Sequence, residues 1–187
     1  HSIGVMAHQR LATFVPPLPP VELRSRVAAP EAEIFLWTGL VDLRNFISLY
    51  RRHETAHAAR PRVLDFGCGC GRMTRFFCHS SKPWAVTGSD VNPELVAFCQ
   101  QHLGGVRTVL NGLAPPLPFE TASFDLAYSL SIFTHFSEIH ARDWLEELAR
   151  VLAPGAILIV TTHGYPAIDI IKDSSHHLSM FQMSAEE

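Results

Sequence analysis

Apolar positions follow two alternating patterns from residue 60 onward. Five short runs are rich in β-branched and other apolar residues, and stretches with apolar residues every three or four positions separate most of them. We expect strands at residues 62–66, 84–89, 106–110, 124–130 and 156–162, and helices at 71–79, 93–103 and 139–152. The last helix ends before Pro154-Gly155, which is a typical stop signal. Apolar strands joined by helices predict an α/β fold with a Rossmann-like, doubly wound, mainly parallel sheet.

The segments before residue 60 differ from this alternation. Residues 14–20 contain four prolines, which favour a stiff strap across the domain surface, or else a ligand for a domain that binds Pro-rich segments. From Pro30, apolar residues at helical spacing predict one helix, or two with a break near Gly39. Such a helix packs against the sheet or covers a ligand. We therefore divide the chain into an extension (1–29) and one domain (30–187), with a helical lead-in (30–59), a core (60–165) and a tail (166–187).

Composition narrows the classes of partner. Apolar residues make up 47% of the chain and the formal net charge is −3, without a run of Lys or Arg that could follow a phosphate backbone. No apolar stretch approaches the roughly 20 residues that a bilayer requires. We expect a cytoplasmic protein with neither a nucleic-acid nor a membrane partner. The four cysteines, whose spacing is atypical for zinc, are expected to be reduced thiols, with no metal bound.

A glycine-rich loop follows the first expected strand. Gly67, Gly69 and Gly71 alternate with other residues just before a helix, and Asp65 lies two positions before the first glycine. A dinucleotide site would instead show G-x-G-x-x-G, and an acidic residue so close would repel a pyrophosphate. Glycine lets a ligand approach the backbone, and the carboxylate favours a cationic ligand.

Residues 65–71, Asp-Phe-Gly-Cys-Gly-Cys-Gly, resemble the acidic-x-Gly-x-Gly-x-Gly motif of class I S-adenosylmethionine (SAM) dependent methyltransferases. The resemblance implies SAM as cofactor and S-adenosylhomocysteine as product. It implies that Asp65 lies near the amino group of the methionine moiety. The residues that it assigns to contacts with this moiety are Asp65, Phe66, Gly67, Cys68, Gly69 and Gly71.

The same resemblance assigns residues that follow the next strands. Asp90, followed by Val91, would accept both ribose hydroxyls, although a helix N-cap is an alternative role. Asn111 would bind the adenine edge, with Gly112 and Leu113 along the ring, unless Asn111 serves only a turn. Two further cofactor contacts are expected at Ser129 and Leu130.

His135 is the candidate general base, because a neutral imidazole can accept a proton near pH 7. A structural role for His135 is an equal alternative, and His163 is a second candidate base.

These residues predict an enzyme that transfers a methyl group from SAM to a small-molecule acceptor, with oxygen as the expected acceptor atom, by in-line displacement. The alternatives are a catalytically silent SAM-binding domain or a fragment of a larger protein, and an NAD-dependent oxidoreductase. In the family, a helix and an antiparallel hairpin usually follow the fifth strand, but only about two dozen residues follow Thr162. We therefore expect the hairpin to be lacking, and a second copy or a further domain to cover the sheet edge.

Overall fold

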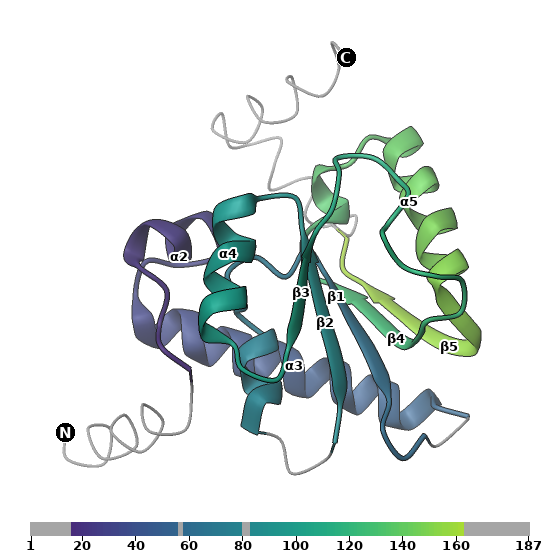
Figure 1. The fold of residues 1–187 in the computed structure, drawn as a ribbon, viewed down its shortest axis with the longest axis horizontal. Coiled ribbons are helices and arrows are strands. Elements are labelled where there is room, and N and C mark those ends of the chain that lie inside the picture. The colour runs from purple at the N-terminus through teal and green to yellow at the C-terminus, as the bar shows by residue number, and fades with distance from the viewer. Residues whose placement is uncertain (1–15, 56–57, 80–82, 163–187) are drawn as a thin grey trace.

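The computed structural model describes residues 16–55, 58–79 and 83–162. In these ranges the chain forms one five-stranded sheet of order β3-β2-β1-β4-β5, in which every neighbouring pair is parallel (Figure 1). The strands are β1 (Arg62–Phe66), β2 (Ala85–Asp90), β3 (Arg107–Leu110), β4 (Phe124–Ser129) and β5 (Leu152–Val160). The predicted doubly wound parallel sheet is confirmed.

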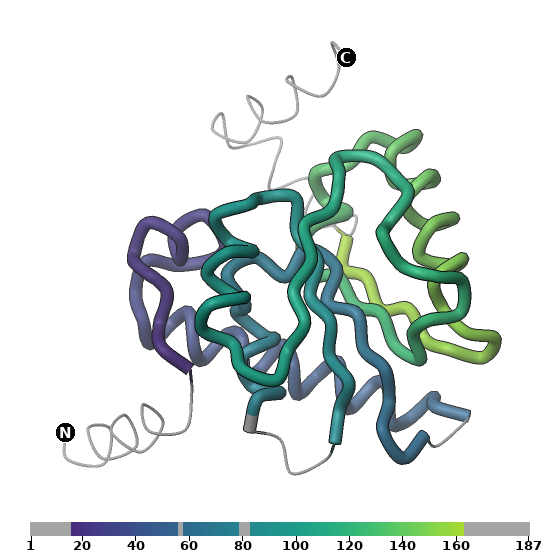
Figure 2. Tube along the Cα trace, in the orientation of Figure 1, coloured from purple at the N-terminus to yellow at the C-terminus, as the bar shows by residue number. Residues whose placement is uncertain are grey.

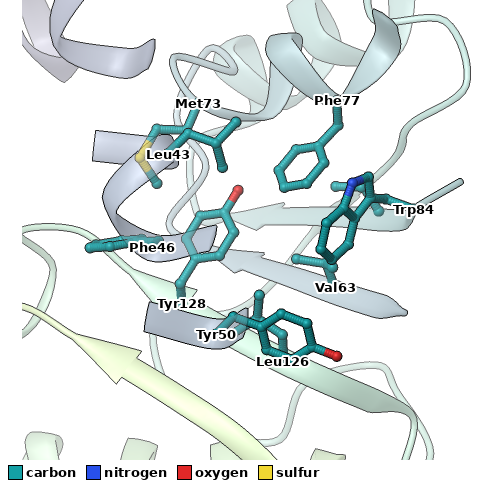
Figure 3. Packing of buried hydrophobic residues seen from close by; sticks show 10 residues of the cluster. Leu43, Phe46, Tyr50, Val63, Met73, Phe77, Trp84, Leu126 and Tyr128 are labelled. Carbon is teal, nitrogen blue, oxygen red and sulfur yellow. The ribbon is translucent and has the colours of Figure 1, made fainter. Parts of the chain in front are cut away.

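Helices cover both faces of the sheet because alternate strand residues point to opposite sides. Val63 of β1 contributes to a core beneath α3 (Ala32–His53), where Phe46 and Tyr128 pack at 5.5 Å between ring centroids (Figure 3). Leu64, the next residue, belongs to the core beneath α5 (Glu138–Val151). The two-sided cover explains why β1, β2 and β4 are buried at nearly every position.

α3 is unbroken over 22 residues, so of the two predicted alternatives the single helix is observed, and not the pair broken near Gly39. A Cβ atom at Gly39 would lie 2.4 Å from the carbonyl oxygen of Arg72. Glycine at this position therefore allows α3 to approach the loop that follows β1, and it does not end the helix.

Two helices begin where polar side chains cap them. Asn92 accepts hydrogen bonds from the backbone N–H groups of Glu94 and Leu95 at the start of α4 (Pro93–His102), and Ser137 accepts one from His140 in α5. Both helices were predicted, with ends that differ by one residue from those expected.

Two elements differ from the prediction by more than one residue at an end, or in type. The expected helix at 71–79 is a turn followed by the 3-10 helix η1 (Thr74–His79), because the backbone conformation of Gly71, with φ of 77°, excludes a helical start there. The expected fifth strand at 156–162 begins earlier, at Leu152, and includes an irregular section around Gly155, where φ is 79°.

The N-terminal segment is anchored to the glycine loop. The Arg75 guanidinium, fully buried, donates to the carbonyls of Pro16 and Pro17 and, through Nε, to Gly71. A short helix that the sequence pattern did not reveal, α2 (Val21–Val27), follows the prolines and lies beside α4 (Figure 2). Leu23 and Val27 of α2 pack against a core cluster that includes Phe35 and Leu95.

No helix in the described residues is long and apolar enough to cross a membrane. In the same part of the chain, β3 and β5 form the two edges of the sheet. The predicted tail at 166–187 lies outside the described residues.

Candidate functional site

A cavity of about 280 Å³ opens at the carboxyl ends of β1, β2 and β4. In open parallel sheets, ligands bind beyond this end of the strands. The residues that line it are Arg26, Val27, Asp65, Gly67, Cys68, Gly69, Arg72, Met73, Asp90, Leu95, Leu130, Ser131, Ile132 and His135.

The glycine loop forms the floor of this cavity. Gly67 and Gly69 adopt φ values of 78° and 56°, which disfavour other residue types. A Cβ atom at Gly67 would meet the Ile132 side chain at 2.3 Å, and one at Gly69 would meet Val27 at 2.7 Å. Two residues distant in sequence therefore pack directly on the glycine backbone.

Asp65 is a buried carboxyl group at the end of β1. Its Oδ2 atom accepts hydrogen bonds from the hydroxyl of Tyr128, at 3.0 Å, and from that of Thr74. Burial raises the pKa of Asp65 to about 6, against the opposing effects of these two hydrogen bonds and of the charge of Arg72. The group therefore changes charge close to neutral pH, where a cationic ligand would favour its ionised form.

Asp90 connects the glycine loop to the start of α4. One carboxylate oxygen accepts from the N–H of Gly69 at 2.8 Å, and the other accepts from the N–H of Asn92 at 2.9 Å. Each oxygen retains capacity for a further hydrogen bond. Asn92 provides the cap of α4, so the alternative N-cap role belongs to Asn92 and not to Asp90.

The residues predicted to hold adenine lie outside the cavity lining. Asn111 follows β3, and its buried Oδ1 atom has no hydrogen-bond partner in the described part of the chain. Leu113, two residues after Asn111, and Val91, directly after β2, are open to solvent and expose 83% and 46% of their surfaces. Gly112 accepts a hydrogen bond from the side chain of Asn111.

Three other predicted contacts are directed into the protein. The Phe66 ring packs on Trp144 at 4.7 Å between centroids, and Gly71 lies against Leu103. Ser129 is fully buried, and its Oγ atom has no partner in the described residues. Leu130, the neighbour of Ser129, lines the cavity as expected.

His135 ends the 3-10 helix η2 (Phe133–His135) and lines the cavity with an exposed side chain. Its backbone N–H donates to the carbonyl of Ile132, and within the described ranges its ring has no hydrogen-bond partner. The imidazole is therefore accessible to a ligand. His163 lies outside the described residues.

Sequence reasoning missed the contribution of α2. Arg26 and Val27 line the cavity, and Arg26 pairs with Glu94 of α4 at 2.5 Å. Arg72, which also lines the cavity, pairs with Asp42 of α3 at 2.8 Å. Arg72 could have been suspected, because it directly follows the glycine motif, but no local pattern marked Arg26.

The cysteines around the loop are free thiols, and Cys68, Cys70 and Cys99 are buried. A hydrogen bond with Cys99, together with burial, holds the pKa of Cys68 well above its usual value, so this thiol is uncharged at neutral pH. In the described residues, no group of three or more His, Cys, Asp or Glu side chains could hold a metal ion.

Comparison with known proteins identifies the domain type. A family described as a methyltransferase domain matches residues 63–155. The chain is 34% identical over 124 residues to a phthiotriol/phenolphthiotriol dimycocerosates methyltransferase of Mycobacterium ulcerans. It is 31% identical over 125 residues to a fatty-acid O-methyltransferase of Mycolicibacterium smegmatis. These matches cover 63% and 64% of this chain, but only 44% of each relative, so the chain spans less than half the length of either.

The crystal structure of a SAM-dependent methyltransferase from Aquifex aeolicus superimposes with a TM-score of 0.54 at 21% identity, over 76% of this chain and 72% of that one. At this level of identity the match establishes the fold.

Proposed function

Because this chain belongs to the class I SAM-dependent methyltransferases, we propose that it binds SAM in the cavity at the carboxyl ends of β1 and β2 and transfers its methyl group to an oxygen of a small, lipid-like acceptor. The observation that carries the proposal is that two carboxylates, Asp65 and Asp90, line the same cavity as Gly67 and Gly69. A cofactor with an ammonium group at one end and ribose hydroxyls further along matches this pair.

The residues present fit this cofactor. The carboxylate of Asp90 can accept ribose hydroxyls beside the two backbone N–H groups that it already binds. The Oδ1 atom of Asn111, which has no partner in the described residues, would accept a hydrogen bond from an adenine amino group, and the exposed Leu113 and Val91 would supply apolar surface for the ring. Asp65, when ionised, holds an ammonium group beside the glycine loop.

When bound, SAM supplies a methyl group already activated by a sulfonium centre. The protein then has to orient the acceptor, which can contribute about 7 to 11 kcal/mol to the barrier reduction. His135 is exposed at the cavity with an unpaired ring among the described residues, so it can accept the proton of an acceptor hydroxyl.

The acceptor class rests on the relatives. One of them is a fatty-acid O-methyltransferase, which supports both oxygen as acceptor atom and an acceptor with an apolar chain. The formal net charge of −3 does not favour nucleic acid as the acceptor. We keep the cytoplasm as the proposed location, which the free thiols support.

The test is a calorimetric titration of the chain with S-adenosylhomocysteine, with NAD as a second titrant. We expect micromolar binding of S-adenosylhomocysteine alone. Asp90→Ala should weaken binding of S-adenosylhomocysteine about 100-fold or more, because its two ribose hydroxyls would lose their hydrogen bonds to a charged acceptor. Asp143→Ala, which removes an exposed carboxylate of α5, is the matched control and should bind like the wild type. Unchanged affinity in Asp90→Ala would refute the site, and failure of the wild type to bind would refute the function.

A further inference from the structure

α3 has an outward face that the sheet does not use. Its buried residues, such as Phe46 and Tyr50, point to the core, whereas Trp37 exposes 67% of its surface and Ile34 exposes 49%. Helical spacing aligns Trp37 with Arg44 and Arg51, seven and fourteen positions later. We call this surface the outer face of α3, and its residues are Ile34, Trp37, Val41, Arg44, Arg51 and Arg52.

The outer face of α3 is apolar toward its start and basic toward its end. Arg44, Arg51 and Arg52 are exposed and form no hydrogen bond or ion pair in the part of the chain that the structure describes. α3 contains two acidic residues, the exposed Glu33 in its first turn and Asp42, which Arg72 holds at 2.8 Å. The part of this face from Arg44 to Arg52 is therefore cationic, on a chain whose formal net charge is −3.

We propose that the outer face of α3 docks the protein on a bilayer with anionic headgroups. Trp37 and Ile34 would enter the headgroup region, where amphipathic rings are favoured, and the three arginines would lie against the lipid phosphates. Trp37 and Ile34, exposed in continuation of the arginines, give the combination of apolar and basic side chains by which interfacial helices bind anionic lipids.

The outer face of α3 lies on the same helical turns that contact the lining of the cavity. On the inner side of the same helical turns, Thr38 and Asp42 accept hydrogen bonds from Arg72, which lines the cavity. A helix is about 10–12 Å across, so a bilayer on the outer face would lie about one helix diameter from the glycine loop. This part of the inference rests on the proposed function, because an acceptor with an apolar chain resides in the bilayer.

The inference revises the expectation from sequence that the chain has no membrane partner. That expectation considered only segments able to span a bilayer, whereas docking requires a few exposed side chains.

The test is sedimentation of the chain with vesicles of phosphatidylcholine alone and of phosphatidylcholine with phosphatidylserine. We expect binding to the anionic vesicles that weakens as salt rises. The triple variant Arg44→Gln/Arg51→Gln/Arg52→Gln should bind about 100-fold more weakly, and Trp37→Ser about tenfold more weakly. Because Trp84 and Trp144 are buried, a blue shift of the fluorescence on binding would report on Trp37.

The matched controls are Arg142→Gln and Ile139→Ser, which change the same kinds of exposed side chain on α5 and should leave vesicle binding unchanged. Equal binding to both kinds of vesicle, or an effect of the α5 variants as large as that of the α3 variants, would overturn the proposal. Absence of vesicle binding by a chain that still binds S-adenosylhomocysteine would overturn it too, without affecting the proposed function. Vesicle binding without S-adenosylhomocysteine binding would support docking while refuting the proposed function.

Discussion

Asp65 combines a structural cost with a place at the lining of the cavity. Its carboxyl group is buried beneath the cavity, with hydroxyl donors from η1 and β4 on one oxygen. These donors do not compensate fully for burial, so the pKa stays raised, at about 6. A buried carboxyl group at this position lowers the stability of the fold relative to a neutral residue.

The raised pKa predicts a pH-dependent stability. Below the ordinary value of 3.8 both the folded and the unfolded state hold the proton, and between 3.8 and about 6 only the folded state does. Stability from Asp65 is therefore present at low pH and is lost as pH rises through about 6, by about 3 kcal/mol in total. Asp65→Asn should remove this loss, which denaturant unfolding of both proteins across this pH range would measure.

Asp125→Asn serves as a control of opposite sign. A hydrogen bond with Arg62 lowers the pKa of Asp125, so the wild type should lose its advantage over this variant as pH falls below about 4. An Asp65→Asn difference that does not vary between pH 4 and 7 would contradict the assigned cause.

At the scale of elements, the turn between β2 and α4 supports both the helix and the site. Asp90 and Asn92 lie two residues apart, yet Asp90 binds the glycine loop and Asn92 caps the helix. The cap holds α4 in the position from which Glu94 pairs with Arg26 of α2. The boundary of one helix therefore affects three segments around the cavity.

Asn92→Ala should lower the free energy of unfolding by about 1 kcal/mol, because two backbone N–H groups lose their acceptor. Asn92→Ser should retain most of the stability, since serine is also a good N-cap. Thermal unfolding would compare the two variants, and equal destabilisation by both would exclude capping as the cause.

For the whole molecule, α3 joins the core, the cavity and the outer surface. Its inner residues pack on the sheet, and Gly39 meets the backbone of Arg72 at the glycine loop. The same helix carries the exposed Trp37 and the three arginines of its outer face, which are unpaired among the described residues. A shift of α3 would therefore move the backbone contact at the glycine loop.

Gly39→Ala should destabilise the protein by about 1–3 kcal/mol, although alanine favours helices, because its Cβ would clash with a backbone oxygen. Gly104→Ala is the matched control, since nothing lies within 4 Å of its Cβ position, and its effect should stay within about 0.5 kcal/mol. Chemical denaturation would measure both, and a stabilised Gly39→Ala variant would contradict the close approach.

The sequence by itself determined the parallel α/β sheet and the place of the cavity. Those features depend on local patterns: apolar runs form strands buried on both faces, and the spacing of Asp65, Gly67, Gly69 and Asp90 puts them at neighbouring strand ends. The roles assigned to single residues toward the cofactor remain predictions.

Only the tertiary structure decided what lies above the glycine loop. Val27 packs on Gly69, and Ile132 packs on Gly67. Arg26 reaches the cavity from a helix that the sequence pattern did not predict. It also decided that Gly39 lies inside an unbroken helix and that η1 replaces the expected helix after the loop. The physical reason is that these features depend on contacts between residues far apart along the chain, whose side chains meet only after the layers have packed.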